Sequence, residues 1–268
     1  MSPDDLAEDP IALSTDGAVT TLWLNRPAKR NAVTYEMWAE FPDRLAQVAA
    51  TSARVLIVRG VGGHFCAGAD ITGLGSRLAD AGTPGGYREV NAAAEAALTN
   101  FPLPTIAVIE GNCIGGGWQI ASACDLRIAQ RGVLLGITPA KLGITYPKEA
   151  IRRTVALVGP SATKRLLYTA ELIDGDEALR LGFLDDLVAD GDLDDAVSAL
   201  CRTLSERSLL TQLATKATVN ALVDSDPNLA ATVASFEKIA TDSVDLAEGL
   251  ASFAERRSAV FTWRPEST

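Results

Sequence analysis

Two glycine-containing turns, each placed after a short β-rich run, constrain this chain most. The first, His64–Ile71, follows Val55–Arg59, and the second, Gly111–Gln119, follows Thr105–Ile109 and contains three consecutive glycines. A glycine tolerates unusual dihedrals, so the N–H group after it can be aimed outward. Glycines at the start of a helix also expose N–H groups at the positive end of the helix dipole. Two such turns facing each other would form an oxyanion hole with two donors.

The β-rich runs alternate with helix-like segments over the first two thirds of the chain. Val19–Leu24 and Val133–Ile137 predict two further strands, and Thr34 is a plausible N-cap for a helix running towards Ala50. Strands that alternate with helices indicate an α/β fold with parallel pairing.

The pattern becomes helical from about Leu193, over 194–207, 209–222 and 228–259. We therefore predict a core over residues 1–200 and a helical region over residues 201–268. Apolar side chains at helical spacing in this region need a cover, from the core or from another subunit; they include Val233, Phe236, Ile239 and Ala240.

Composition excludes several classes of protein. The 268 residues carry a net charge of −10, which argues against general binding to nucleic acid or to an anionic membrane. The acidic start lacks the apolar segment of a signal peptide, and four cysteines without C-x-x-C spacing indicate buried thiols. His64 is the only histidine, which excludes a His-rich metal site. We expect a cytoplasmic protein that binds no metal.

Several further motifs accompany the two turns, and together they resemble the crotonase superfamily, also called the enoyl-CoA hydratase/isomerase family. The marks are Asn25-Arg26-Pro27 with Asn31-Ala32, Phe65–Ile71, Glu110-Gly111 with Gly115-Gly116-Gly117, Cys124–Arg127, Thr138-Pro139, and Glu248-Gly249 with Phe253–Arg257. The resemblance implies stacked β-β-α turns, a helical C-terminal trimerisation region, and assembly as a homotrimer or a dimer of trimers. It implies acyl-CoA substrates and no separate cofactor, because coenzyme A is part of the substrate.

The resemblance also implies roles for individual residues. The N–H groups of Ala69 and Gly116 would hold the thioester oxygen and stabilise an enolate. Lys29 and Arg30 would hold the 3′-phosphate ADP end of coenzyme A, and Arg256 could reach the coenzyme A of a neighbouring subunit. The remaining candidates for substrate binding are Ala67, Asp70 and Ile71 near the adenine, and Ala140. Trp118 and Tyr87 are either walls of the acyl pocket or ordinary core or surface aromatics.

Two positions depart from the hydratase pattern. Gln119 and Ala140 stand where the resemblance places the two glutamates that activate water. A glutamine is not a general base at neutral pH, and an alanine has no proton to give. We therefore expect weak or absent activity as a conventional hydratase.

Other residues could replace the missing groups. The stretch Thr138–Tyr146 partly resembles a branch of the family that contains methylmalonyl-CoA decarboxylase, and Tyr146 and Gln119 could orient a carboxylate there. Glu149 could act as a base, although it also suits an exposed helix start, and His64 is better explained by a supporting role. The open alternatives are a hydratase or isomerase, a malonyl-type decarboxylase, a thioester hydrolase, and a CoA-thioester-binding protein without turnover.

Overall fold

The computed structural model describes residues 9–72 and 83–265, and the chain divides into two units. The first unit runs to Phe101 and resumes from Thr105 to Val197. The second comprises Pro102–Pro104 and the chain from Ser198 onward. The division falls close to the boundary expected at residue 200.

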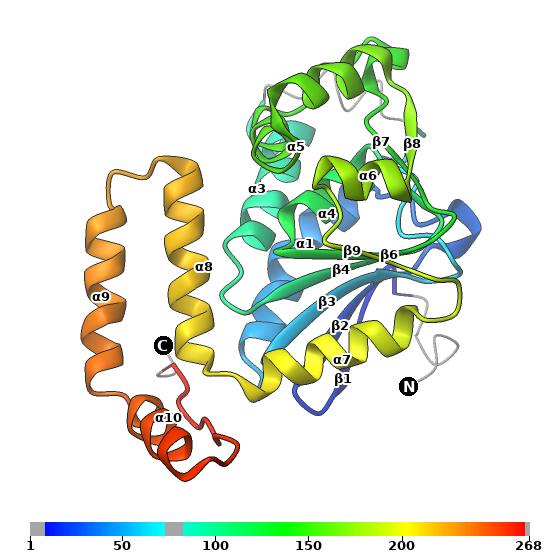
Figure 1. Ribbon diagram of the computed structural model, residues 1–268. Helices are drawn as coiled ribbons and strands as arrows, with labels where there is room; N and C mark the ends of the chain where they lie inside the picture. The colour runs from blue at the N-terminus through cyan, green and yellow to red at the C-terminus, as the bar shows by residue number, and fades with distance from the viewer. Residues whose placement is uncertain (1–8, 73–82, 266–268) are drawn as a thin grey trace. The chain divides into compact units, whose positions relative to one another are not determined.

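A sheet of six strands forms the centre of the first unit (Figure 1). Its order is β1 (Ile11–Asp16), β2 (Val19–Leu24), β3 (Val55–Gly60), β4 (Thr105–Ile109), β6 (Leu126–Gln130) and β9 (Asp186–Val188). Only β1 and β2 pair antiparallel, and the other pairs are parallel. All five residues of β4 are buried, as its run of apolar and β-branched residues requires. The predicted α/β core with parallel pairing is confirmed.

A second, smaller sheet consists of β5 (Asn112–Ile114), β7 (Leu134–Gly136) and β8 (Leu172–Asp174). The chain passes from β4 to β5 and then into helix α4 (Gly116–Ala123). It next passes from β6 to β7 and, through the short helix η3 (Pro139–Leu142), into α5 (Lys148–Thr169). These successive β-β-α turns are the expected architecture, and each turn brings a loop to the start of a helix.

Two helices from the first part of the chain complete the surroundings of α4. Helix α1 (Tyr35–Ala49) begins at Thr34, whose hydroxyl accepts a 3.2 Å hydrogen bond from Met37 N. It buries an apolar stripe and packs against α3 (Tyr87–Thr99), which in turn contacts α4. The stripe consists of Met37, Trp38, Phe41, Leu45 and Val48. Three further helices are η2 (Pro27–Lys29), α6 (Gly175–Leu181) and α7 (Leu193–Glu206).

The second unit is helical, with α8 (Leu209–Asp224), α9 (Leu229–Thr241) and α10 (Val244–Glu255). The prediction of one helical segment over 228–259 was wrong, because the chain breaks between α9 and α10. Ser243 begins the new helix, since its hydroxyl accepts a hydrogen bond from Asp245 N and caps α10. Asp245 also fixes the C-terminal segment, because its Oδ1 accepts from Thr262 N and Trp263 N. In the described part of the chain, no helix combines the length and the apolar character needed to cross a membrane.

Candidate functional site

The two glycine-containing turns lie side by side because a parallel bridge joins Cys66 to Cys113. Cys66 N donates to the Asn112 carbonyl oxygen at 2.8 Å, and Ile114 N donates to the Cys66 carbonyl oxygen at 2.9 Å. Gly117 must be a glycine here, since a Cβ at that position would lie 2.5 Å from the Cys66 carbonyl oxygen. Backbone pairing therefore fixes the two turns in one register.

Each turn presents an N–H group directly after a glycine with positive φ. Gly68 has φ +119° and precedes Ala69, whereas Gly115 has φ +54° and precedes Gly116. These conformations favour glycine, as expected from the sequence. The two donors are close, because a Cβ built on Gly116 would lie 3.2 Å from Ala69 N. Among the described residues, no backbone or side-chain acceptor takes either N–H group.

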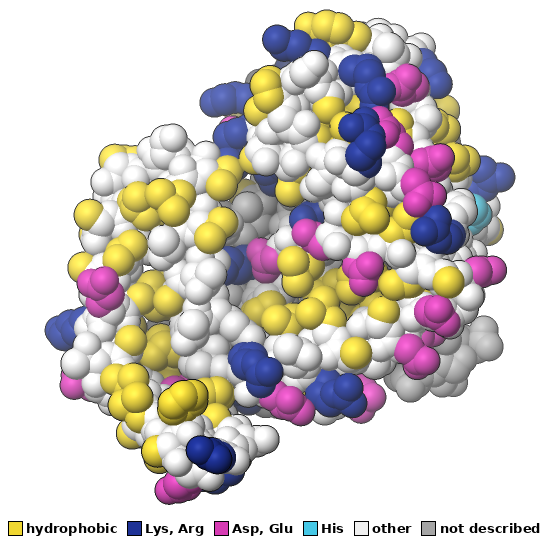
Figure 2. Space-filling model, viewed as in Figure 1, with side chains coloured by type: hydrophobic (Ala, Val, Ile, Leu, Met, Phe, Trp, Pro, Cys, Tyr) yellow, Lys and Arg dark blue, Asp and Glu magenta, His cyan; other side chains and the backbone are white. Residues whose placement is uncertain are grey.

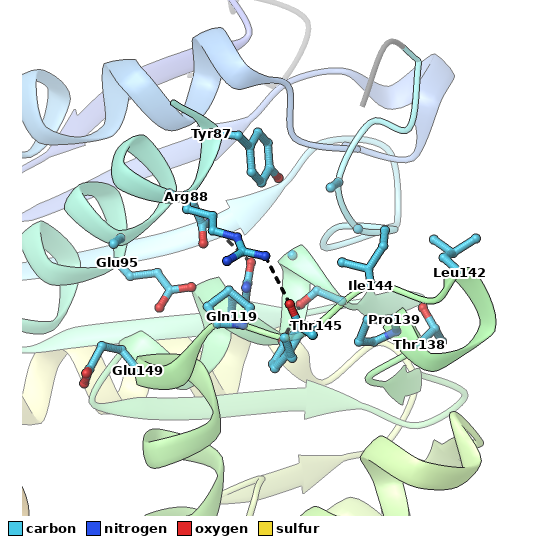
Figure 3. A pocket seen from close by; sticks show the side chains of 18 of the residues that line it. Tyr87, Arg88, Glu95, Gln119, Thr138, Pro139, Leu142, Ile144, Thr145 and Glu149 are labelled. Atoms are coloured by element: carbon cyan, nitrogen blue, oxygen red, sulfur yellow. Dashed lines mark hydrogen bonds between the residues drawn. The ribbon is translucent and has the colours of Figure 1, made fainter. Parts of the chain in front are cut away.

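A cavity of about 570 Å³ opens beside these two turns. This volume is typical of a site for a small organic ligand. Figure 3 shows its walls, which come from the first turn, α3, the start of α4, and the segment from η3 to the start of α5. The lining residues used below are Ala69, Tyr87, Arg88, Asn91, Glu95, Gly116, Gln119, Thr145, Tyr146 and Glu149.

Gln119 lies in this cavity, one turn along α4 from Gly116, and it is 6% exposed. Its Oε1 accepts a 3.4 Å hydrogen bond from Asn91 Nδ2 of α3. Ala140 lies on η3 and is exposed, next to the lining residue Pro139. The structure thus places an amide inside the cavity and a methyl group near its rim.

The Tyr146 hydroxyl donates to the Gly115 carbonyl oxygen at 2.9 Å. That oxygen also accepts from Gln119 N at 3.0 Å. Burial raises the pKa of the Tyr146 hydroxyl well above its usual value, so the group stays protonated and remains a donor. The hydroxyl hydrogen is therefore directed at the protein backbone, and not at a carboxylate in the cavity.

The sequence analysis did not identify Glu95, a carboxylate on α3 that lines the cavity. Its side chain is 1% exposed and forms an ion pair with Arg153 of α5 through Oε2. Its Oε1 is buried and has no hydrogen-bond partner in the described structure. Burial raises the pKa of Glu95, and the positive charge of Arg153 opposes that shift. One signal was available in the sequence, because Asn91 and Glu95 are spaced four residues apart in an alanine-rich segment and so share a helix face.

Glu149 also lines the cavity, but its carboxylate is bound elsewhere. Arg152 Nε donates to Glu149 Oε2 at 2.8 Å, and this hydrogen bond holds the pKa of Glu149 below its usual value. Glu149 lies in the first turn of α5, where a negative charge is favourable. The interpretation of Glu149 as a helix-start residue is therefore the better supported one.

His64 supports the second turn from outside the cavity. Its Nδ1 accepts a 3.2 Å hydrogen bond from Asn112 N, and its carbonyl oxygen accepts from Asn31 Nδ2. Because Nδ1 is the acceptor, the neutral ring carries its proton on Nε2. This arrangement agrees with the supporting role expected for this histidine.

The residues expected near coenzyme A fall into two places. Lys29 and Arg30 are exposed at η2, and the Arg30 carbonyl oxygen accepts from Ala67 N at 2.9 Å. Asp70 pairs with Arg26 at 2.9 Å, and Ile71 is 67% exposed and lines the cavity. These residues are thus brought together around the first turn. Arg256 belongs to the second unit, where it ends α10 with φ 54°.

Trp118 does not line the cavity, and the structure corrects that expectation. The side chain is fully buried, stacks on Phe183 with ring centroids 3.6 Å apart, and donates from Nε1 to Thr154 Oγ1 at 3.0 Å. Successive residues of a helix point about 100° apart. Because Gln119 faces the cavity, its neighbour Trp118 faces the core.

The stacked β-β-α turns and the cavity beside two unused backbone donors define a crotonase-type protein. The chain belongs to the enoyl-CoA hydratase/isomerase family, whose model matches residues 14–264. It is therefore an enzyme that acts on acyl-CoA.

Individual relatives show the breadth of this family. The chain is 32% identical to a crotonyl-CoA hydratase of Syntrophomonas wolfei, over 96% of this chain and 99% of the relative. It is 31% identical to a peroxisomal Delta(3,5)-Delta(2,4)-dienoyl-CoA isomerase of Arabidopsis thaliana, over 77% and 79% of the two chains. A solved enoyl-CoA hydratase/carnithine racemase from Magnetospirillum magneticum superimposes with a TM-score of 0.90 at 30% identity, covering 96% and 97%.

Proposed function

We propose that the cavity binds the acyl group of a CoA thioester, with its carbonyl oxygen between the N–H groups of Ala69 and Gly116. The reaction then passes through a thioester enolate, whose negative charge grows on that oxygen. The observation that carries the proposal is the meeting of two unused N–H groups at one wall of the cavity. In a comparable site, the loss of one such donor costs ~10²–10³ in rate.

The backbone around Gly116 favours a strong donor. Gly116 is the first residue of α4, where the helix dipole is positive. The Gly115 carbonyl oxygen, in the same peptide group as Gly116 N, accepts two hydrogen bonds. Hydrogen bonds on the carbonyl oxygen polarise the peptide and strengthen the donor on its other side.

The cavity is poorly suited to adding water by the two-glutamate route. Gln119 and Ala140 occupy the positions that the family resemblance gives to those glutamates. Neither side chain transfers protons at neutral pH. We therefore place this chain among enzymes that form an enolate without that pair, and we expect slow hydration of crotonyl-CoA.

A second candidate is decarboxylation of a malonyl-type CoA ester, and Arg88 favours it. Arg88 lines the cavity, and its guanidinium donates to the neutral hydroxyl of Thr145 at 3.2 Å (Figure 3). A cation at this place would pair with the carboxylate of such an acyl group. Loss of carbon dioxide leaves the same enolate and requires no base.

The same proposal covers the binding of coenzyme A and the assembly of subunits. Lys29 and Arg30 bind the phosphates beside the first turn, and the chain works in the cytoplasm as a homotrimer or a dimer of trimers. Apolar side chains on α8, α9 and α10 support such assembly, because they are exposed in the single chain (Figure 2). They include Val219, Leu222, Ile239, Leu250 and Phe253.

The test is a panel of 2-enoyl-, 3-enoyl- and malonyl-type CoA esters, with products followed by mass spectrometry and binding by calorimetry. Binding with rearranged or protonated products supports an enolate-forming enzyme, and carbon dioxide release selects the second candidate. Binding of every ester without any product contradicts the enolate-forming step for this class of substrates. If the protein binds none of the esters, the proposal is contradicted.

A further inference from the structure

We propose that Glu95 of α3 is the carboxylate that carries the proton in this cavity. The inference rests on the proposed function, because it requires an acyl thioester held by Ala69 and Gly116. The two usual glutamate positions, 119 and 140, lie on α4 and η3, whereas Glu95 lies on α3. The proposal therefore adds a catalytic residue on a third element.

The geometry favours Glu95 over the other carboxylate of the cavity. Figure 3 shows the Glu95 carboxylate turned towards Gln119, whereas the Glu149 carboxylate is turned away. Gln119 lies on the same helix as Gly116, three residues further on, and α3 contacts α4. Glu95 therefore faces the wall that carries one of the two oxyanion donors.

The two oxygens of Glu95 have different environments. Oε2 is held by Arg153, while the buried Oε1 has no hydrogen-bond partner in the described structure. A buried acceptor without a partner is destabilising, so a proton donor at Oε1 is favoured. A carboxylate anchored through one oxygen and free at the other is suited to take a proton in a defined direction.

The surroundings of Glu95 adjust its basicity from three sides. Arg153 of α5 favours the ionised form, and Glu149 of the same helix opposes it. Tyr87 of α3 and Tyr146 lie near enough for their own ionisation to be affected by Glu95, and both stay protonated. The ion pair keeps Glu95 available as a base, and its burial makes that base stronger than an exposed glutamate.

The step is balanced without any other reactant. The C–H bond of the carbon next to the thioester breaks, and its proton passes to Glu95 Oε1. The electron pair moves onto the thioester oxygen between Ala69 and Gly116. The Glu95 carboxylic acid exchanges this proton with solvent and then gives a proton, or a deuteron in D₂O, to a carbon of the enolate, so nothing is oxidised or reduced.

The experiment incubates the full-length protein with 3-butenoyl-CoA in D₂O and measures deuterium uptake into the acyl group by mass spectrometry. Butanoyl-CoA serves as the binding probe. We expect uptake with the wild type, and Glu95→Gln should slow it by ~10²–10⁴-fold while binding of butanoyl-CoA changes little. If a folded Glu95→Gln variant took up deuterium at the wild-type rate, the proposal would be overturned.

Two further variants keep the test decisive. Glu95→Gln leaves the Arg153 charge unbalanced and could prevent folding, whereas Glu95→Asp keeps both charges and only withdraws the carboxylate. Such misplacement should slow uptake by about 10²-fold, and uptake at the wild-type rate would contradict the proposal. Glu149→Gln tests the rival carboxylate, and loss of uptake in this variant alone assigns the base to Glu149 instead.

Measurements on the wild type distinguish a failure of the role proposed for Glu95 from a failure of the proposed function. Binding of butanoyl-CoA without deuterium uptake overturns the role of Glu95 and leaves acyl-CoA binding intact. Absence of binding overturns the proposed function itself.

Discussion

The Tyr146 hydroxyl and the Gly115 carbonyl oxygen are joined by a 2.9 Å hydrogen bond. The same peptide group carries Gly116 N–H, one of the two donors assigned to the thioester oxygen. Under the proposed function, Tyr146 would act on the reaction through the backbone, by holding and polarising the Gly115–Gly116 peptide group.

Replacing Tyr146 by phenylalanine should lower kcat more than it raises KM. The variant keeps the ring but removes the hydrogen bond, whose net value is about 1 kcal/mol, so we expect a loss of about fivefold. Steady-state kinetics on the best ester of the panel measures the two constants. An unchanged kcat would show that the Gly115 peptide needs no support from Tyr146.

Gly116→Pro removes one backbone donor, although a Cβ at this position lies only 3.2 Å from Ala69 N, so the fold of the variant must be checked. Gly116 is the first residue of α4, and proline is common there. We expect turnover to fall by ~10²–10³-fold. Circular dichroism and thermal melting check the fold, and normal turnover in a folded variant would remove Gly116 from the site.

Gln119→Glu combined with Ala140→Glu should increase the hydration of crotonyl-CoA. Each general acid or base is worth ~10²–10⁴ in rate, so the double variant should exceed both single variants. Loss of the conjugated-thioester absorbance follows the reaction. Hydratase-like speed in the unmodified protein would show that another residue already activates water.

The pH profile distinguishes the two carboxylates of the cavity. A base must be ionised to accept a proton, so kcat/KM falls as the pH drops through its pKa. Burial raises the pKa of Glu95 above the ordinary 4.5, whereas the Arg152 hydrogen bond lowers that of Glu149. We expect an acid limb above pH 4.5 that is absent from the residual activity of Glu95→Gln. A limb below pH 4.5 would favour Glu149.

Phe253→Glu should weaken subunit assembly. Phe253 is 87% exposed on α10, and a charge at this place would oppose burial against another subunit. Sedimentation velocity at micromolar concentration should give a trimer or hexamer for the wild type and smaller species for the variant. A monomeric wild type would contradict the proposed assembly.

Local sequence patterns predicted the elements whose cause is local. Thr34 begins α1 because a threonine hydroxyl can cap a helix, and Gly68 and Gly115 mark turns because their φ angles suit glycine. The break before α10 was missed, although Ser243 is a good N-cap. The apolar spacing continues across it, so the periodicity alone favoured one helix.

The composition of the cavity could not be predicted in the same way. Glu95 is remote in sequence from both glycine-containing turns, and its place depends on how α3 packs against α4. Trp118 illustrates the opposite error, since an aromatic residue beside the turn suggested a pocket wall. Only the rotation of α4 shows that Gln119 faces the cavity and Trp118 faces Phe183.

The backbone bridge between Cys66 and Cys113 has a consequence for which substitutions this chain can accept. Both assigned donors are main-chain groups carried by one hydrogen-bonded ladder, so most side-chain substitutions leave them in place. Arg88 and Glu95 project from α3 and Gln119 projects from α4, outside that ladder, so their side chains can be exchanged one at a time. Substitutions at these three positions should therefore change the reaction of the bound thioester while the two backbone donors stay in place.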